Sequence, residues 1–207
     1  MTGPLAGPVV VCLGGGSGKA RAGEWGATLE WLVARLAPRF PDLGLVEVRY
    51  RVRSWREIES CIADARAATE ASVDAGATRC ALLGFSLGGA VSVAAAGHPT
   101  VSHVIGLAPW LPERLLDGGT LVGRRLAVVH GQLDAWLPFI PGVSVARTRA
   151  AVERFSEQGV ETSYTLIRGG VHGLALRAPW GGLLRLPRAG GWIDPIGGAL
   201  REFRDAV

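Results

Sequence analysis

Short apolar runs alternate with helical patterns along most of this chain. The runs have the length and composition of strands buried on both faces of a sheet. They cover residues 9–13, 45–50, 79–84, 101–107, 125–131 and 161–167. Because helical segments separate most of them, consecutive strands run parallel, with right-handed crossovers. The alternation predicts an α/β fold with a doubly wound, mostly parallel sheet of about six strands and helices on both faces.

The segments between the runs carry apolar residues at helical spacing. The predicted helices cover residues 24–37, 54–76, 88–96, 144–158 and 196–206. In the second of these, Ser54 and Glu57 have the spacing of a capping box, which predicts that the helix begins there.

Length and composition indicate a globular protein. Of the 207 residues, 48% are hydrophobic and only 19% are charged, which excludes intrinsic disorder. The chain contains neither an internal repeat nor a linker-like tract. We therefore expect a single domain spanning residues 1–207.

The charge pattern does not favour a nucleic-acid partner. The net charge is +4, but the positive residues are scattered along the chain. Arg49, Arg51 and Arg53 come closest to a patch, and their alternation on a strand indicates one solvated face. No apolar stretch is long enough to predict a membrane span, and the N-terminus lacks the pattern of a signal peptide.

Three cysteines, Cys12, Cys61 and Cys80, cannot all form pairs with one another. Cys12 and Cys80 also lie inside apolar runs. Reduced, buried thiols are the simplest interpretation, and they fit a cytoplasmic protein.

A G-x-S-x-G motif runs from Gly84 to Gly88, directly between an apolar run and a helix of small residues. A serine on such a sharp turn projects its hydroxyl above the carboxyl edge of the sheet, where it can act as a nucleophile. The adjacent amide of Leu87, at the start of the helix, can stabilise an oxyanion. The alternative is a strand-to-helix turn that needs small residues for packing alone. The flanking strand and helix favour Ser86 as a nucleophile.

A serine nucleophile needs a histidine base, and four histidines are available. His98 and His103 are expected away from the carboxyl edge, whereas His130 ends a strand and is expected to be packed or hydrogen-bonded near that edge. His172 lies in a glycine-flanked loop just beyond the last apolar run. That position favours His172 as the base.

An acid is needed to orient the base, and Asp134 follows another strand end at the same edge. The alternative role of Asp134 is to cap a turn. Glu113 and Asp117, which follow the preceding strand, are the substitutes.

With these motifs in the order Ser86, Asp134 and His172, the chain resembles the α/β-hydrolase family and its small lidless, dienelactone-hydrolase-like branch. The resemblance also rests on H-G-x-x-D at 130–134 and V-H-G at 171–173. It implies Ser86 as nucleophile, His172 as base and then acid, and Asp134 as the orienting acid.

The loop after the first strand departs from the family's usual H-G and reads Leu-Gly-Gly-Gly-Ser-Gly at 13–18. The second oxyanion donor is therefore open among Gly15, Gly16 and Ser17, of which we choose Gly16. The sequence of this loop matches neither the P-loop motif nor the dinucleotide-binding motif. We expect no cofactor and no metal.

Two tryptophans, Trp110 and Trp136, follow strand ends and are candidates for the substrate pocket; the alternative is that they only cover a core edge. The loop 174–194 forms either a pocket wall or an irregular excursion. Only 17 residues (108–124) separate two strands where larger relatives carry a cap, so no cap domain is expected.

These features predict a serine hydrolase that cleaves a small carboxylic ester or thioester through an acyl-enzyme. Acyl transfer, lactone opening and peptide cleavage on the same triad remain alternatives, as does a non-catalytic binding protein with this fold. The oligomeric state is not indicated.

Overall fold

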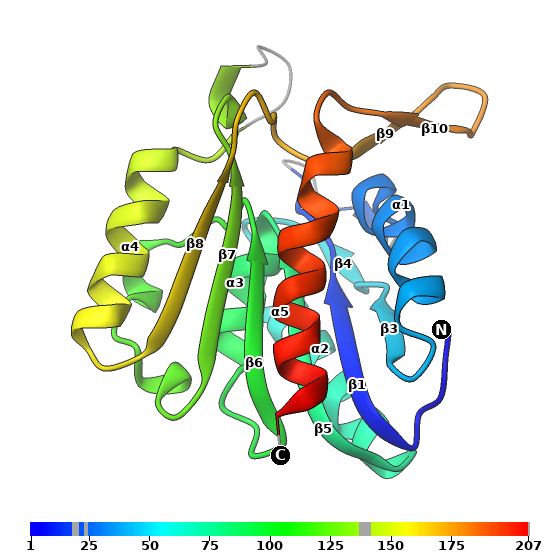
Figure 1. Cartoon of the computed structure of the whole chain (residues 1–207), viewed down its shortest axis with the longest axis vertical. Helices are drawn as coiled ribbons and strands as arrows, with labels where there is room; N and C mark the ends of the chain where they lie inside the picture. Colours follow the sequence, from blue (N-terminus) through cyan, green and yellow to red (C-terminus); the bar gives the residue numbers. More distant parts are fainter. Residues whose placement is uncertain (18–20, 23–24, 137–141, 207) are drawn as a thin grey trace.

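A computed structural model describes residues 1–17, 21–22, 25–136 and 142–206. Its main sheet has six strands in the order β3-β1-β5-β6-β7-β8, and all neighbouring strands are parallel (Figure 1). These strands are β1 Gly7–Leu13, β3 Gly44–Val48, β5 Ala77–Phe85, β6 Val101–Leu107, β7 Arg125–Gly131 and β8 Glu161–Ile167. Each predicted run is a strand, so the predicted sheet is confirmed.

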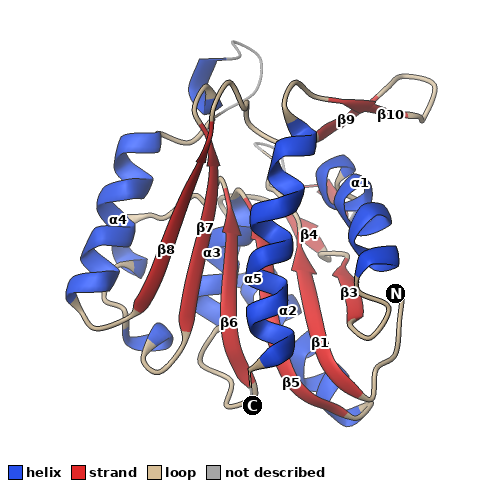
Figure 2. Cartoon of the chain, in the orientation of Figure 1, coloured by secondary structure: helices blue, strands red, loops and turns tan. Residues whose placement is uncertain are grey.

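Helices cover both faces of this sheet (Figure 2). They are α1 Ala27–Leu36, α2 Ile58–Asp74, α3 Leu87–Ala95, α4 Val145–Glu157 and α5 Ile193–Asp205. One apolar layer joins α1 and α5 to the sheet, and the other joins α2, α3 and α4 to its opposite face. Burial on both faces explains why the inner strands β1, β5 and β6 are mostly continuous apolar runs, whereas the edge strand β8 alternates between exposed and partly buried residues.

The chain reverses its winding direction between β1 and β5. From β1 it moves outward to β3, and α2 then carries it back past β1 to β5 on the other side. In an open α/β sheet, such a reversal leaves a crevice at the carboxyl ends of the two strands. The loop after β1 and the turn after β5 therefore meet at one place.

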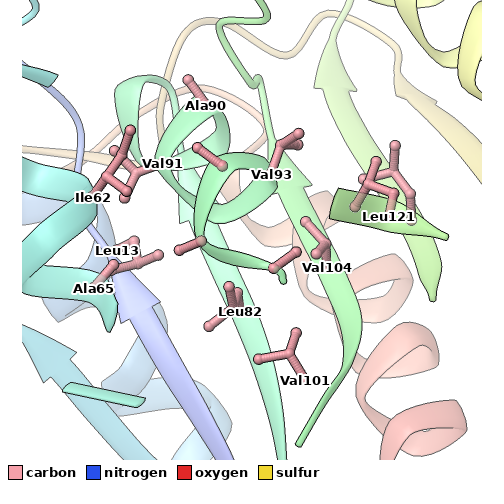
Figure 3. Close-up of a cluster of buried hydrophobic side chains, with 14 of the residues drawn as sticks. Leu13, Ile62, Ala65, Leu82, Ala90, Val91, Val93, Val101, Val104 and Leu121 are labelled. Atoms are coloured by element: carbon pink, nitrogen blue, oxygen red, sulfur yellow. The ribbon is translucent and has the colours of Figure 1, made fainter. Parts of the chain in front are cut away.

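The layer around α3 is built from small and branched side chains (Figure 3). Ala90, Val91 and Val93 of α3 belong to one buried cluster with Leu82 of β5 and Val104 of β6. Small residues on the helix let it lie close to the sheet, and each fully buried Val or Leu contributes about 1.5–3 kcal/mol. This packing places the N-terminus of α3 firmly at the carboxyl edge of β5.

The predicted capping box is wrong. Helix α2 begins at Ile58, after Glu57, and no side chain caps it. Ser54 Oγ instead accepts a hydrogen bond from the backbone N–H of Arg56, 3.2 Å away. A serine side chain can accept a hydrogen bond from a nearby backbone amide in a tight turn as well as at a helix N-terminus. Ser54 therefore belongs to a turn that precedes the helix.

The arginine run after β3 also differs from the prediction. Strand β3 ends at Val48, and Arg53 lies in β4 (Val52–Arg53), which pairs antiparallel with β2 (Arg21–Ala22). Arg51 makes an ion pair with Asp64 of α2. The three arginines therefore do not form one solvated strand face.

The loop 174–194 is ordered rather than irregular. It contains the antiparallel hairpin of β9 (Ala175–Arg177) and β10 (Leu183–Arg185), and then the short helix η5 (Ala189–Trp192) that leads into α5. In Figure 1 the hairpin extends beyond α1 at the carboxyl edge of the sheet.

The segment 108–124 holds two short 3-10 helices, η2 (Glu113–Leu115) and η3 (Gly119–Leu121).

The three cysteines are free and buried, as predicted. Among the helices in the described part of the chain, none combines the length and apolar character needed to cross a bilayer.

Candidate active site

Ser86 stands at the turn between β5 and α3, in a strained backbone conformation. Its φ of 53° and ψ of −112° lie in a region that residues other than glycine rarely adopt. Holding one residue there costs on the order of 1–3 kcal/mol, so the surroundings must enforce it. Backbone bonds do so: the Ser86 N–H donates to Leu107 O at 2.9 Å, and the Ser86 carbonyl accepts from Gly89 and Trp110 at 3.0 Å.

The motif glycines allow this turn because their neighbours are in direct contact. A Cβ on Gly88 would lie 2.1 Å from the carbonyl oxygen of Leu13 in β1, and one on Gly84 would lie 2.1 Å from the carbonyl oxygen of Gly88. Both distances are far below van der Waals contact. Strand β5, helix α3 and the neighbouring strand β1 therefore approach one another closely at this turn.

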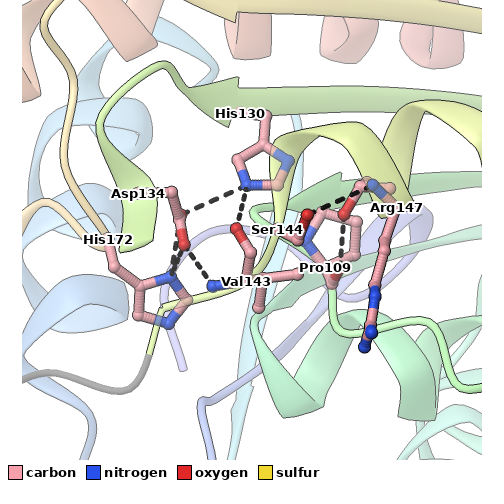
Figure 4. Close-up of polar contacts among 8 residues, drawn as sticks. Pro109, His130, Asp134, Val143, Ser144, Arg147 and His172 are labelled. Carbon is pink, nitrogen blue, oxygen red and sulfur yellow. Dashed lines mark hydrogen bonds and ion pairs between the residues drawn. The ribbon is translucent and has the colours of Figure 1, made fainter. Parts of the chain in front are cut away.

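Asp134 and His172 come together from two different strand ends. Asp134 follows β7 and His172 follows β8, and His172 Nδ1 lies 2.8 and 3.0 Å from the two carboxylate oxygens of Asp134. Both side chains are buried. Figure 4 shows the other ring nitrogen of His172 turned away from Asp134. This arrangement holds His172 with Nδ1–H toward the acid and leaves Nε2 available as a base.

A second histidine, His130, also contacts this carboxylate (Figure 4). His130 Nε2 lies 3.3 Å from Asp134 Oδ2 and 3.2 Å from the carbonyl oxygen of Val143. The backbone N–H of Val143 donates to Asp134 Oδ1. His130 is thus hydrogen-bonded near the carboxyl edge, as expected, and in addition it touches the predicted acid directly.

The environment of Asp134 favours its charged form. Burial alone would raise the pKa of this carboxyl, but hydrogen bonds from His130 and His172, the charge of His172 and the Val143 amide together lower the pKa below its ordinary value. An ionised carboxylate in this position can stabilise a protonated His172.

The substitute acids lie elsewhere. Glu113 forms an exposed ion pair with Arg154, and Asp117 accepts a hydrogen bond from the backbone of Gly119. His98 and His103 make their polar contacts with Thr100 and Ser102, away from the carboxyl edge. Burial and nearby arginines lower the pKa of His103 to about 4.

Ser86 and His172 line the same cavity, which has a volume of about 370 Å³ and which we call the His172 cavity. Gly16, Phe85 and the first residues of α1 also line it, together with Ala175, Leu176 and Arg177 of β9. The ring of Phe85 stacks obliquely on that of His172, with centroids 4.9 Å apart. The loop 174–194 therefore contributes a pocket wall.

The two predicted oxyanion donors, Leu87 and Gly16, lie close to each other, and Gly16 lines the His172 cavity. Leu87 is the first residue of α3, so its N–H is one of the helix amides without an intrahelical acceptor. Gly15, Gly16 and Ser17 follow β1 and all line the His172 cavity. Gly16 packs against the elbow, since a Cβ on it would lie 2.9 Å from Leu87 Cδ2.

A second cavity, of about 250 Å³, also has Ser86 in its lining, and we call it the tryptophan cavity. Trp55, Trp110, Gly142 and Val143 line it with Ser86. Trp110 thus borders the nucleophile, and it also packs against the core. The side chain of Trp136 lies outside the described residues, so its predicted place in the pocket stays a prediction.

Sequence reasoning missed Trp55, which lines both cavities. The motif at 54–57 assigned this residue to a helix start. Trp55 nevertheless follows a predicted strand, and the carboxyl ends of parallel strands meet at one edge. That rule, applied to the strand at 45–50, identifies the segment as part of the site.

No protein-family model matches the sequence. The curated proteins contain no match either. Solved structures do match over nearly the whole chain, with identities too low to establish more than the fold.

Three of these structures are representative. A dienelactone hydrolase-like promiscuous phosphotriesterase from metagenomic libraries is 21% identical, with a TM-score of 0.60 over 98% of this chain and 87% of its own. Esterase PE8 is 17% identical, with a TM-score of 0.61 over 97% of this chain and 94% of its own. SOBER1 of Arabidopsis thaliana is 15% identical, with a TM-score of 0.64 over 94% and 100%. The chain has the α/β-hydrolase fold, as the resemblance implied.

Proposed function

We propose that the protein is a serine hydrolase that cleaves a small carboxylic ester or thioester through an acyl-enzyme. The observation that carries this proposal is the strained Ser86 at the β5–α3 turn, in one cavity with a His172 that Asp134 holds by two short contacts. Strained backbone, a nucleophile and an oriented base seldom coincide without a catalytic role. Esterases among the solved structures with this fold support the same activity.

The proposed reaction has two halves. Ser86 Oγ attacks the carbonyl carbon while His172 Nε2 takes the hydroxyl proton, and the amides of Leu87 and Gly16 bind the oxyanion. The intermediate collapses, the bond to the leaving oxygen or sulfur breaks, and His172 gives its proton to the leaving alcohol or thiol. Water then attacks the acyl-enzyme, with His172 accepting its proton, and the acid is released as Ser86 recovers its hydrogen.

The site is proposed to be open, in a single domain without a cap. The 17 residues at 108–124 form loops and the short helices η2 and η3 rather than a separate layer. The β9–β10 hairpin then serves as the main cover, through Ala175, Leu176 and Arg177. An open site suits a small substrate that enters directly from solvent.

Hydrolysis of a chromogenic ester such as p-nitrophenyl butyrate tests this function. Ser86→Ala and His172→Ala should each lower kcat by about 10⁴-fold or more, because the members of such a triad act as a unit. His98→Ala is the matched control, since His98 contacts Thr100 away from the carboxyl edge, and it should retain full activity. Turnover by Ser86→Ala at the wild-type rate would overturn the proposal.

A further inference from the structure

The two cavities that Ser86 lines differ in chemistry. The described residues that line the tryptophan cavity are Trp55, Trp110, Gly142, Val143 and Ser86, and among these only Ser86 carries a hydroxyl or charged side chain. The His172 cavity includes polar and charged side chains, among them Arg53 and Arg177. Ser86 and Trp55 are the residues common to both.

Two contacts hold the tryptophans in place at this boundary. The backbone N–H of Trp110 donates to the Ser86 carbonyl at 3.0 Å, which ties Trp110 to the elbow. The indole of Trp55 lies against Gly16, where an added Cβ would come within 2.3 Å of its Nε1. Trp55 therefore stands between the two cavities, directly beside the proposed oxyanion donor.

The chemistry of acyl transfer assigns the two halves of the substrate to the two sides. His172 must protonate the leaving group, so that group has to lie within reach of His172. His172 lines the larger cavity and is not among the residues lining the tryptophan cavity. The acyl group, bonded to Ser86 in the intermediate, then extends to the opposite side.

We infer that the acyl group of the substrate binds between Trp55 and Trp110, and that its alcohol or thiol binds in the His172 cavity. This inference rests on the proposed function and deepens it. At about 250 Å³, the tryptophan cavity is smaller than a typical whole-ligand pocket of about 300–1,000 Å³. The substrate class is an ester or thioester of a short or aromatic apolar acid with a more polar leaving group.

Two ester series separate the two sides. In the first, p-nitrophenol is the constant leaving group and the acid lengthens from acetate to octanoate. In the second, acetate is constant and the alcohol varies in size, with hydrolysis followed by acid release. For each variant, kcat/KM is measured across both series, and wild-type turnover in either series establishes the hydrolase activity independently.

A substitution in one cavity should change kcat/KM in only one of the two ester series. Trp110→Ala enlarges the tryptophan cavity and should raise the octanoate-to-acetate ratio of kcat/KM by about tenfold or more, since each methylene in an apolar pocket is worth about tenfold or more. Leu176→Trp narrows the His172 cavity, where Leu176 is half-exposed on β9. It should disfavour bulky alcohols by about tenfold and leave the acyl ranking unchanged.

Matched variants complete the test. Trp110→Leu is a milder change that should shift the acyl ranking in the same direction if Trp110→Ala fails to fold. Val122→Ala shortens an apolar side chain that is 66% exposed before β7, and it should change neither series. The inference is overturned if Trp110→Ala shifts the alcohol series instead, or if both site variants shift both series. The proposed function itself would be overturned if the wild type hydrolysed no ester in either series and a fluorophosphonate did not label Ser86.

Discussion

At the scale of single residues, the carboxylate of Asp134 is shared between two histidines with different environments. His172 borders a cavity, whereas His130 is fully enclosed. The carbonyl of Val143 can only accept a hydrogen bond, so the His130 nitrogen that faces it, Nε2, carries the proton. The same N–H points at Asp134 Oδ2. In the proposed mechanism, His130 would therefore act as a positioning residue for Asp134.

Replacing His130 should separate this positioning from substrate binding. His130→Leu removes the donor and should lower kcat of ester hydrolysis by about tenfold, the equivalent of one hydrogen bond to a charged group. KM should hardly change, because His130 is not among the residues that line either cavity. His130→Gln can place an N–H near the same point and should recover part of kcat. Equal kcat values for the Leu and Gln variants would contradict the positioning role.

The lowered pKa of Asp134 makes its contribution to stability depend on pH. A carboxyl with a folded-state pKa below its unfolded value, about 3.9, adds stability that is complete above that value. The contribution is lost as the pH falls through the folded-state pKa. Asp134→Asn should therefore lower the free energy of unfolding by about 2–3 kcal/mol at neutral pH, and by progressively less below about pH 4.

Urea denaturation at several pH values measures this difference. Asp194→Asn is the control, because its side chain is 88% exposed in an ion pair with Arg39 and should contribute less than about 1 kcal/mol at any pH. A penalty for Asp134→Asn that stays constant down to pH 3 would show that its charge is not what stabilises the fold.

At the scale of elements, the β5–α3 turn depends on glycine at a point of backbone contact. Gly88→Ala would place a methyl group against the Leu13 carbonyl, and a backbone group cannot move aside as a side chain can. We expect a loss of about 3 kcal/mol or more in the free energy of unfolding. Gly198→Ala, in α5 where an added Cβ meets nothing within 4 Å, should be neutral or stabilise by up to about 1 kcal/mol. Equal stability of the two variants, in thermal denaturation, would contradict the close approach.

Elements with strong periodic patterns were predictable, and elements that depend on distant partners were not. The runs at 101–107, 125–131 and 161–167 match β6, β7 and β8 residue for residue. Burial makes β6 and β7 largely apolar, whereas the edge strand β8 alternates between exposed and partly buried residues. The β9–β10 hairpin has strands of three residues, too short for a pattern, and it lies beside α1, far away in the sequence. The start of α2 was misplaced because a serine turn imitates a cap.

In the site, too, the sequence predicts residues placed by local pattern but not contacts between distant parts of the chain. Ser86, Asp134 and His172 could be selected because each follows a strand end at one edge of the sheet. The contacts of His130 with Asp134, and of Trp55 with Gly16, depend on side-chain packing between separate loops. The residue pattern within one loop does not predict its contacts with another loop.

At the scale of the whole molecule, the sheet order gathers the site from across the chain. The reversal between β1 and β5 brings Gly16 beside Ser86, and the next strands in the order β6, β7 and β8 deliver Trp110, Asp134 and His172 in turn. If this assembly makes Ser86 a nucleophile, as we propose, Ser86 should form a covalent bond with an electrophilic probe.

The most direct test is labelling of the folded protein with a fluorophosphonate, followed by mass spectrometry of the modified peptide. We expect one adduct, on Ser86, in the wild type and in the control Ser156→Ala, whose serine is exposed on α4. Labelling should be lost in Ser86→Ala and strongly slowed in His172→Ala. A correctly folded wild-type protein that stays unlabelled, or that carries the adduct on another residue, would contradict this proposal.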